Sequence, residues 1–458
     1  MRAADPAAAV RRALGAADPA RWQPGAGGRR LVVAIGKAAP AMAAAALEQL
    51  GPGPAIVVTA PDAPGRAALP AGVELLSGGH PLPDAGSLAA GARLLAAAGD
   101  LGPRDLMLVL VSGGASAMVE APRPPLDLPA LRALNRLLLE SGFDITRTNL
   151  VRQALSRLKG GGLARVAAPA RVETLILSDV IGDDPRAVAS GPTVAAVGRP
   201  SEAEALLRAR GLWPRLPEPV RAALAAAVAA EAAGEDPTMA PANAAPAEVI
   251  GSNALSLAAM AEAARRAGGR SVRCLAPPLT GDVAEAAARL CAALGEAEAA
   301  ARAGRPQAVL AGGETTVVVR GPGRGGRNQE LALRVALAAE GRRAVPWVLL
   351  AAGSDGRDGP TPHAGGLVDA GTAARIRAAG ADPEALLAAN DSARALELAG
   401  AAFDSGPTGT NVADLTVLLV GSAVLGRGEC RSHELRHWRE RTPALDDSRV
   451  MQETRRNA

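Results

Sequence analysis

Two arginines and a glycine-rich loop lie together in the stretch 308–333, AVLAGGETTVVVRGPGRGGRNQELAL. Arg324 and Arg327 carry guanidinium groups, whose forked donors suit phosphate and carboxylate. The loop leads into a predicted helix that begins near Arg327-Asn328-Gln329-Glu330. Backbone N–H groups at such a loop and helix start also attract anions. The stretch therefore predicts an anion site, and phosphate chemistry is the first chemistry that it suggests.

Lysine is the next informative residue type, because the chain holds only two lysines among its 50 Lys plus Arg. Where arginine has replaced lysine nearly everywhere, a retained lysine indicates a position that needs a compact ammonium group. Lys37 directly follows a predicted strand at 31–35, and Lys159 lies near the end of a predicted helix. We expect both ammonium groups to contact a ligand.

Carboxylates cluster after another predicted strand, 172–177, in the run Ser178-Asp179-Val180-Ile181-Gly182-Asp183-Asp184. Oxygen donors of this kind are the ligands that Mg²⁺ prefers. The alternative is a solvated acidic turn in which Asp183 or Asp184 caps the next helix. We expect Asp179 and Asp184 to be the metal ligands.

The elements that would hold these residues alternate between short apolar runs and helical stretches, which is typical of a parallel sheet covered by helices. Glycines follow three of the predicted strands, at Gly36, Gly78 and Gly113. Ligands of open α/β sheets gather at the carboxyl ends of strands, where a glycine lets a ligand approach the backbone. The alternative is that these glycines only form tight turns. The strands predicted in the first half span 31–35, 56–59, 73–76, 106–111 and 172–177.

A Pro/Ala-rich segment, PTMAPANAAPAE (237–248), predicts a linker, after which the alternation restarts. We therefore expect an N-terminal domain over 1–240, a C-terminal α/β domain over 246–422 and a weakly ordered tail over 423–458. The strands predicted in the second half span 249–250, 272–275, 308–311, 316–319, 347–352 and 415–420.

Composition excludes several classes of function. The arginines are scattered and aromatics make up 1% of residues, so bases would find no stacking platform and no nucleic-acid partner is expected. The longest alanine-rich run, 222–230, is too short to span a membrane. Three cysteines without CxxC spacing, and an N-terminal helix capped by Asp5 with Pro6 in its first turn, indicate a cytoplasmic protein rather than a secreted one.

The loop also contains Gly321-x-Gly323-x-x-Gly326, which has the form of a dinucleotide fingerprint and suggests a dehydrogenase. Arg320 and Pro322 disrupt that pattern, and the next acidic residue after a strand, Asp355, comes about 30 residues later rather than about 20. The fingerprint is therefore a weak indication.

Taken together, the motifs resemble the MOFRL-type glycerate 2-kinases over about residues 5–420. The motifs that carry the resemblance are VVAIGKAAPAM (32–42), SGGHPLPD (77–84), LVSGGASAM (110–118), NLVRQALSRLKGGGLA (149–164), LSDVIGDDPRAVASGPT (177–193), AGGETTV (311–317), GRGGRNQELAL (323–333), GSDGRDGPT (353–361) and GPTGTNVADL (406–415).

The resemblance implies an enzyme that uses ATP and Mg²⁺ to phosphorylate D-glycerate at its 2-hydroxyl, giving 2-phosphoglycerate. It also implies a Rossmann-like N-terminal domain facing a smaller α/β domain across a cleft, with the MOFRL region at about 305–420. Lys37 and Arg327 match the residues most tied to catalysis in that family. One departure is His363, where an acidic or small residue is more usual.

The remaining site residues are expected to bind phosphate and substrate, while three carboxylates compete for two roles. Asp179, Glu314 and Asp355 are candidates for holding Mg²⁺ and for accepting the 2-hydroxyl proton, and we count Asp355 among the catalytic residues. An NAD(P)H-dependent hydroxypyruvate reductase is the alternative function, and a homodimer stays open as the assembly. The expected binding residues are Gly36, Ser112, Gly113, Gly114, Ser116, Lys159, Glu314, Thr315 and Asn328.

Overall fold

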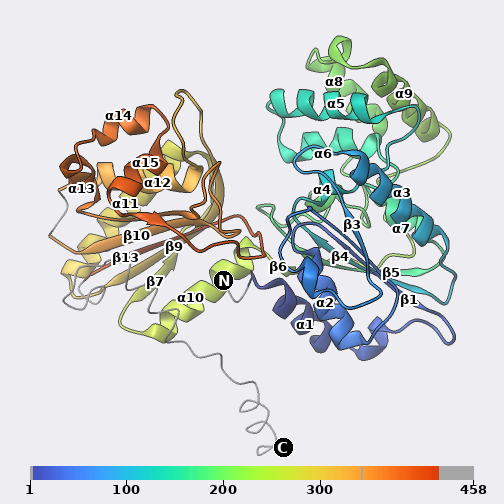
Figure 1. Ribbon diagram of the computed structural model, residues 1–458, viewed down its shortest axis with the longest axis horizontal. Coiled ribbons are helices and arrows are strands. Elements are labelled where there is room, and N and C mark those ends of the chain that lie inside the picture. The colour runs from blue at the N-terminus through green and yellow to red at the C-terminus, as the bar shows by residue number, and fades with distance from the viewer. Residues whose placement is uncertain (1–3, 342–343, 422–458) are drawn as a thin grey trace, which may run out of the picture.

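The computed structural model describes residues 4–341 and 344–421, which form two α/β lobes (Figure 1). The first lobe contains a parallel sheet with the strand order β3-β2-β1-β4-β5-β6. This is the order of a doubly wound Rossmann fold, in which the winding reverses between β1 and β4. The predicted parallel sheet is confirmed. Its strands are β1 (Arg30–Ile35), β2 (Ala55–Thr59), β3 (Glu74–Ser77), β4 (Leu106–Ser112), β5 (Arg171–Leu177) and β6 (Glu248–Gly251).

Helices cover both faces of this sheet, because alternate strand residues point to opposite sides. Val33 and Val109 pack in one buried cluster with residues of α3 and α7, whereas Val32 and Leu108 pack in another with residues of α1 and α2. The predicted cap of α1 is confirmed, since Asp5 Oδ1 accepts a hydrogen bond from the Ala8 N–H at 2.7 Å. These helices are α1 (Pro6–Ala16), α2 (Ala39–Leu50), α3 (Ala85–Gly99), α4 (Ala115–Met118) and α7 (Gly162–Ala167).

Four further helices form a layer of their own at the top of the first lobe in Figure 1. Their apolar faces share one buried cluster, which includes Leu134, Val151, Leu207 and Val220. The four helices are α5 (Leu128–Glu140), α6 (Ile145–Ala154), α8 (Pro200–Ala209) and α9 (Glu218–Ala232).

The second lobe is built on a mixed sheet whose path is β12-β11-β10-β13-β9-β7, with β8 also paired to β9. The pairs from β12 to β9 are antiparallel, and β7 and β8 run parallel to β9. The strands are β7 (Ser271–Cys274), β8 (Leu279–Asp282), β9 (Gln307–Thr316), β10 (Trp347–Gly353), β11 (Gly365–Asp369), β12 (Ala402–Phe403) and β13 (Asp414–Val420).

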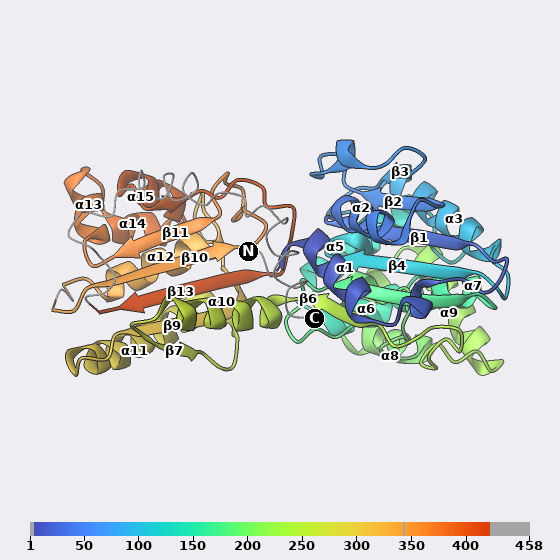
Figure 2. The same cartoon turned by 90° about the horizontal axis from the view of Figure 1, so that it is seen from below.

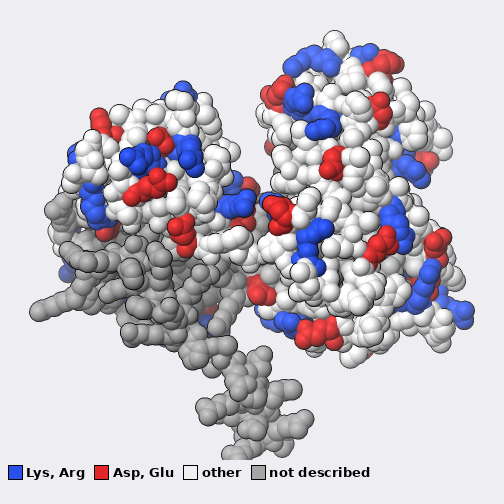
Figure 3. Space-filling model, viewed as in Figure 1, with Lys and Arg blue, Asp and Glu red and all other residues white. Residues whose placement is uncertain are grey.

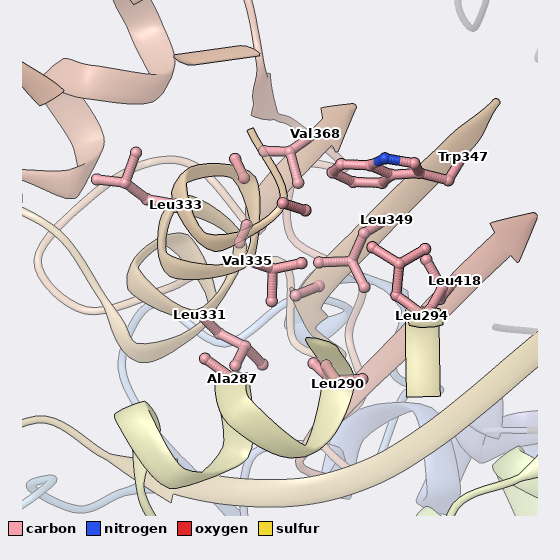
Figure 4. Packing of buried hydrophobic residues seen from close by; sticks show 14 of the residues in the cluster. Ala287, Leu290, Leu294, Leu331, Leu333, Val335, Trp347, Leu349, Val368 and Leu418 are labelled. Atoms are coloured by element: carbon pink, nitrogen blue, oxygen red, sulfur yellow. The ribbon is translucent and has the colours of Figure 1, made fainter. Parts of the chain in front are cut away.

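The core of the second lobe lies between this sheet and two helices. Figure 4 shows Leu290 of α11 and Leu331 and Val335 of α12 packed beside Leu349 and Leu418 of the sheet. The helix α12 therefore starts from a rigid support, which fixes the position of its first residue, Arg327. The helices of this lobe are α10 (Asn253–Ala267), α11 (Val283–Arg302), α12 (Arg327–Ala338), α13 (Thr372–Ala378), α14 (Pro383–Ala388) and α15 (Ser392–Leu398).

Two predicted strands differ in the structure. The expected break at Gly312-Gly313 is absent, because β9 continues as one strand to Thr316; the strand predicted over 316–319 is therefore wrong. Val318 and Val319 are instead exposed, at 57% and 75%. The strand predicted at 249–250 forms, but it pairs with β5 of the first sheet. The domain boundary stays a prediction, and this pairing favours a position after Gly251. The predicted tail lies outside the described residues.

Two segments connect the lobes. In Figure 2, α10 runs from β6 of the first lobe along the second sheet. The Asn253 side-chain amide donates to the carbonyls of Val412 and Asp414 at 2.8 and 2.9 Å. The Thr410 hydroxyl donates to the Ala4 carbonyl at 2.6 Å, and Val412 packs in the cluster of α1 and α2. No helix within 4–341 or 344–421 has both the length and the apolar character needed to cross a bilayer.

Candidate active site

The point where the first sheet reverses its winding holds Lys37. Lys37 follows β1, and its backbone N–H donates to the Gly113 carbonyl after β4 at 2.9 Å. Ser112 ties the same two loops together, since its hydroxyl accepts from the Ala38 N–H at 3.1 Å and donates to the Ile35 carbonyl at 3.3 Å. We expected Ser112 to bind phosphate or substrate. Its buried hydroxyl instead makes hydrogen bonds that hold the two loops together.

Asp179 lies beside Gly113, although the two residues follow different strands. A Cβ added at Gly113 would lie only 1.9 Å from Asp179 Oδ2, so the close packing requires glycine. Burial raises the pKa of Asp179, and the nearby charge of Lys37 opposes that rise. Lys37, Gly113 and Asp179 therefore form one cluster at the carboxyl ends of β1, β4 and β5.

His80 belongs to the same cluster, but we did not predict it as a site residue. A Cβ added at Gly114 would lie 3.3 Å from both His80 Cδ2 and Lys37 Cγ, so both side chains pack against that glycine. Burial lowers the pKa of His80, and Lys37 lowers it further. The only signal in the sequence is its place in the motif at 77–84.

The second lobe contributes Arg327, whose guanidinium is held by two carboxylates. Its Nε and Nη2 donate to Asp414 at 2.6 and 3.0 Å, and its Nη1 lies 3.2 Å from Glu314 Oε1. Burial disfavours the charged guanidinium, but the bonds to Asp414 outweigh this and raise the pKa of Arg327. Such a two-pronged contact orients the guanidinium plane as well as its charge.

Sheet pairing explains why Asp414 is available to Arg327. Asp414 opens β13, where it lies opposite Gly313 of β9 on one side and Gly353 of β10 on the other. Its side chain is buried, which raises its pKa, while the bonds from Arg327 oppose that rise. We did not predict Asp414, because its partner Arg327 lies 87 residues away and only the antiparallel sheet brings them together.

The pKa of Glu314 depends on charged residues of both lobes. Desolvation by the surrounding protein is the largest cause of its raised pKa, although the side chain is 46% exposed; Arg327 opposes the rise and Asp414 supports it. Asp179 raises the pKa of Glu314 further and Lys37 lowers it, so both residues of the first lobe lie within electrostatic range. Figure 3 shows the surface hollowed between the lobes, with acidic and basic side chains at its base.

The start of α12, where we expected an anion to bind, is already occupied by a carboxylate of the chain itself. Asp358 accepts hydrogen bonds from the backbone N–H groups of Asn328 and Gln329 at 3.1 and 2.7 Å. The Asn328 amide also donates to Asp414 at 2.9 Å. The helix start therefore positions Arg327 and Asn328, and its backbone donors are not free for phosphate.

The glycine-rich loop packs against protein rather than opening toward a ligand. Its Gly323 N–H donates to the Ala389 carbonyl at 2.9 Å. A Cβ added at Gly325 would lie 2.1 Å from Ser392 Oγ, and one at Gly326 would lie 2.2 Å from Asp358 Cγ. The glycines allow this close contact between segments, so the apparent dinucleotide fingerprint does not form a dinucleotide loop.

Lys159 does not join the cluster around Lys37. Its Nζ forms an ion pair with Glu120, and both side chains are buried, at 1% and 5% exposure. The helix α6 ends at Ala154, so Ser156 and Lys159 lie beyond it, and Ser156 Oγ donates to Glu120 at 2.6 Å. Because the Lys159 ammonium is buried and paired with Glu120, the structure argues against the ligand contact that we expected for it.

Asp184 is likewise engaged elsewhere. Its carboxylate receives Nε and Nη2 of Arg186, with the shortest contact at 2.8 Å, and it also accepts from the Arg186 N–H. This matches the acidic-turn alternative and argues against Asp184 as a metal ligand. Across the described residues, no group of three or more His, Cys, Asp and Glu is placed to hold a metal ion.

The structure also describes the surroundings of the remaining expected residues, Ser116, Asp355, Thr315 and Gly36. Ser116 Oγ is 3.0 Å from Ser190 Oγ, and Asp355 Oδ1 accepts from the Arg357 N–H at 3.0 Å. Asp355 also lies near enough to Asp414 to raise the pKa of that residue. Thr315 is a buried residue of β9, and Gly36 lies against Ser112.

Asp358 gives a testable pH dependence. Burial raises its pKa to about 6, and the charge of Asp414 adds to the rise. Since its pKa is raised on folding, the native state binds more protons than the unfolded state between about pH 4 and 6. The contribution of Asp358 to stability therefore falls as pH rises through that window, by about 3 kcal/mol in all.

Urea unfolding of the wild type and of Asp358→Asn, measured from pH 4 to 7, tests this expectation. The difference between the two free energies of unfolding should change in favour of the variant as pH rises to about 6, and then stay level. Taking the difference cancels the slopes of the other carboxyl groups. Two parallel curves would contradict the raised pKa.

The chain matches two families, with residues 1–225 matching a domain of unknown function, DUF4147, and residues 307–414 matching the MOFRL family. It is 37% identical over 396 residues to the D-glycerate 2-kinase of Thermotoga maritima, covering 86% of this chain and 91% of that protein. It is 40% identical over 406 residues to an Agrobacterium vitis protein provisionally named hydroxypyruvate reductase, covering 86% and 88%.

Similarity extends to solved structures. The crystal structure of glycerate kinase from Thermotoga maritima superposes with a TM-score of 0.80 at 36% identity, covering 92% of this chain and 96% of that one. A Pyrococcus horikoshii protein superposes with a TM-score of 0.75 at 32% identity, covering 92% and 95%. These matches confirm the resemblance drawn from the motifs. The chain belongs to the MOFRL-type glycerate 2-kinase family, glycerate kinase type II.

Proposed function

We propose that this protein transfers the terminal phosphoryl group of ATP to the 2-hydroxyl of D-glycerate, giving 2-phosphoglycerate and ADP. The observation that carries the proposal is the facing of two cationic groups across the lobes. Lys37 lies at the winding reversal of the first sheet, and Arg327 is held by Asp414 on the second. Glu314 forms an ion pair with Arg327 and lies within electrostatic range of Lys37. Phosphoryl transfer depends on positioning and on neutralising charge, and this arrangement supplies both.

The two cations have different proposed roles. Lys37 acts as a compact point charge on the phosphate groups, since its stem lies against Gly114 at the end of β1. Arg327 presents a planar fork whose orientation Asp414 fixes, which suits the transferred phosphoryl group or the glycerate carboxylate. Both charges would offset the negative charge that spreads over the phosphoryl oxygens during transfer.

We further propose Glu314 as the acceptor of the 2-hydroxyl proton. Partial desolvation raises its pKa, and a carboxylate with a raised pKa accepts a proton more readily, while its 46% exposed side chain stays within reach of a substrate. Asp355, the residue that we had counted as catalytic, makes a hydrogen bond within its own loop and acts on the site through Asp414. This division favours Glu314 for the proton and leaves Asp355 a supporting role.

Mg²⁺ is the metal that this reaction implies, and Asp179 fits it. The Asp179 carboxylate offers hard oxygen donors beside Lys37, and no other described residue forms a hydrogen bond with its side chain. Mg²⁺ usually takes one or two carboxylates and completes its shell with phosphate oxygens and water, so a single carboxylate is sufficient. Bound Mg²⁺ would neutralise phosphate charge. Asp179 would hold it close to the charge of Lys37.

A coupled ADP-release assay with D-glycerate, ATP and Mg²⁺ tests the function, with the product separated as 2- or 3-phosphoglycerate. The proposal predicts ADP release that depends on D-glycerate, and 2-phosphoglycerate as product. A parallel arm supplies hydroxypyruvate and NADH without ATP. Oxidation of NADH in that arm, with no ADP release in the first, would favour the reductase named for the Agrobacterium relative.

Gly113 allows a finer test of the first-lobe cluster. Changing Gly113 to alanine should lower the kcat of ADP release by about tenfold, because the added methyl group must displace the Asp179 carboxylate. Gly15→Ala in α1 is the matched control, since nothing lies within 4 Å of a Cβ added there. Equal activity of both variants would show that the position of Asp179 does not matter.

A further inference from the structure

A cavity of about 220 Å³ lies in the first lobe, between the end of α6, the helix α7 and the segment that leads into α8. It shares no lining residue with the cluster of Lys37, Asp179, Glu314 and Arg327. We call it the α6–α7 pocket. Its charged lining residues are all cationic, and they are Arg123, Arg157, Lys159 and Arg165.

The charges of these four residues are not equally compensated. Lys159 is neutralised by Glu120. Arg165 donates to the carbonyls of Gly160, Pro237 and Met239 at 2.6, 2.9 and 2.9 Å, which engages both of its terminal nitrogens without cancelling its charge.

Arg123 and Arg157 make no ion pair with any residue in the described part of the chain. The Nε of Arg123 is buried there without a hydrogen-bond partner. Burying such a donor unpaired is costly, so an acceptor placed beside it would stabilise the pocket. Three arginines thus line one cavity that has no carboxylate in its lining.

Acidic groups near the pocket do not remove this imbalance. Asp236 lies next to lining residue Pro237 and acts on Arg165, as does Glu235. However, the Asp236 carboxylate is already bound by Arg199 at 2.8 Å and by the Thr238 N–H at 2.9 Å. Burial is the largest cause of the lowered pKa of Arg165, and repulsion from Arg123 lowers it further.

We infer that the α6–α7 pocket binds a small phosphate-bearing anion, either free phosphate or a phosphate monoester. Guanidinium groups match phosphate oxygens with paired, directional donors. A dianion would offset most of the positive charge of Arg123, Arg157 and Arg165. The volume is below the range of about 300–1,000 Å³ typical of drug-sized ligands, so the ligand is small. The pocket is separate from the proposed catalytic site.

Calorimetric titration of inorganic phosphate into the full chain at constant ionic strength tests the inference. Arg123→Gln and Arg157→Gln should each weaken binding by about tenfold or more, because each removes a charge-assisted contact. Arg157 is exposed, so its variant should fold even if Arg123→Gln does not. Arg132→Gln, an exposed position on α5 outside the lining, removes the same charge and should change nothing.

An Arg327→Gln variant separates this pocket from the cleft, where phosphate could also bind. Phosphate binding that persists in Arg327→Gln and is lost on adding Arg157→Gln supports the inference. Binding abolished by Arg327→Gln alone, or insensitive to both pocket variants, would overturn it. A parallel titration with methyl phosphate distinguishes the two sources: binding indicates a phosphate monoester, and its absence indicates free phosphate.

Discussion

Replacing Lys37 by arginine is expected to lower the kcat of ADP release by about 10²–10³-fold, although the positive charge is kept. Lys37 occupies a confined place, because its backbone N–H is bonded to the Gly113 carbonyl and its stem lies against Gly114, where the His80 ring also packs. The larger, planar guanidinium cannot put its charge where the compact ammonium lies. Losing one well-placed donor to the charge that develops during reaction typically costs this much.

Steady-state kinetics of the variant, with D-glycerate and ATP varied in turn, would measure the effect. The loss should fall mainly on kcat, since the interaction is strongest in the transition state. Arg132→Lys is a suitable control, because it makes the reverse exchange at an exposed position of α5. If Lys37→Arg kept nearly normal kcat, the proposed role of the ammonium would be wrong.

The second large effect concerns stability, at the other lysine. Lys159→Met should lower the free energy of unfolding by about 3–5 kcal/mol, because it leaves the Glu120 carboxylate buried without its ionic partner. Glu120 keeps its hydrogen bonds from Ser156 and from the Ala121 N–H, so the lower end of this range is expected.

Urea unfolding near pH 7 would measure this loss. The matched control is the double variant Lys159→Met with Glu120→Gln, which removes both charges and should recover most of the lost stability. If the single and double variants were equally unstable, lost packing rather than an uncompensated charge would be the cause.

The first sheet could be predicted well from the sequence, because its determinants are local. Continuous apolar runs such as 106–111 have the length and residue types of buried strands, and glycines mark the turns that follow them. The positions of Lys37 and Asp179 at the ends of these strands were predicted from the same pattern. Their proximity follows from parallel pairing, which places all carboxyl ends at one edge.

The strands of the second lobe were harder to predict from the sequence, because glycines there allow close contact between segments that are distant in sequence. Gly312 and Gly313 looked like a strand end, yet they lie inside β9. A Cβ at Gly312 would meet Asn253 Oδ1 at 1.9 Å, and one at Gly313 would meet the Leu279 carbonyl at 2.0 Å. The glycines make room for neighbours that are remote in sequence, a role that a local pattern cannot distinguish from a turn.

Two acidic residues of the site were not predicted, because their hydrogen-bond partners are distant in sequence. Asp358 reaches the start of α12 across 30 residues, and Asp414 reaches Arg327 across 87. Both lie in motifs that we had noted, but neither residue type nor spacing indicated its partner. Asp184, by contrast, has a local partner, since Arg186 is only two residues away, and this contact favours the acidic-turn alternative.

The scarcity of lysine has a practical consequence for covalent labelling. Of the two side-chain amines in the sequence, that of Lys159 is sealed from solvent, while Lys37 is only partly buried. A reagent that acylates lysine side chains should therefore modify one lysine of the folded protein. The protein carries a natural attachment point for a probe at its proposed catalytic centre, and occupancy of that centre could be followed by protection from the reagent.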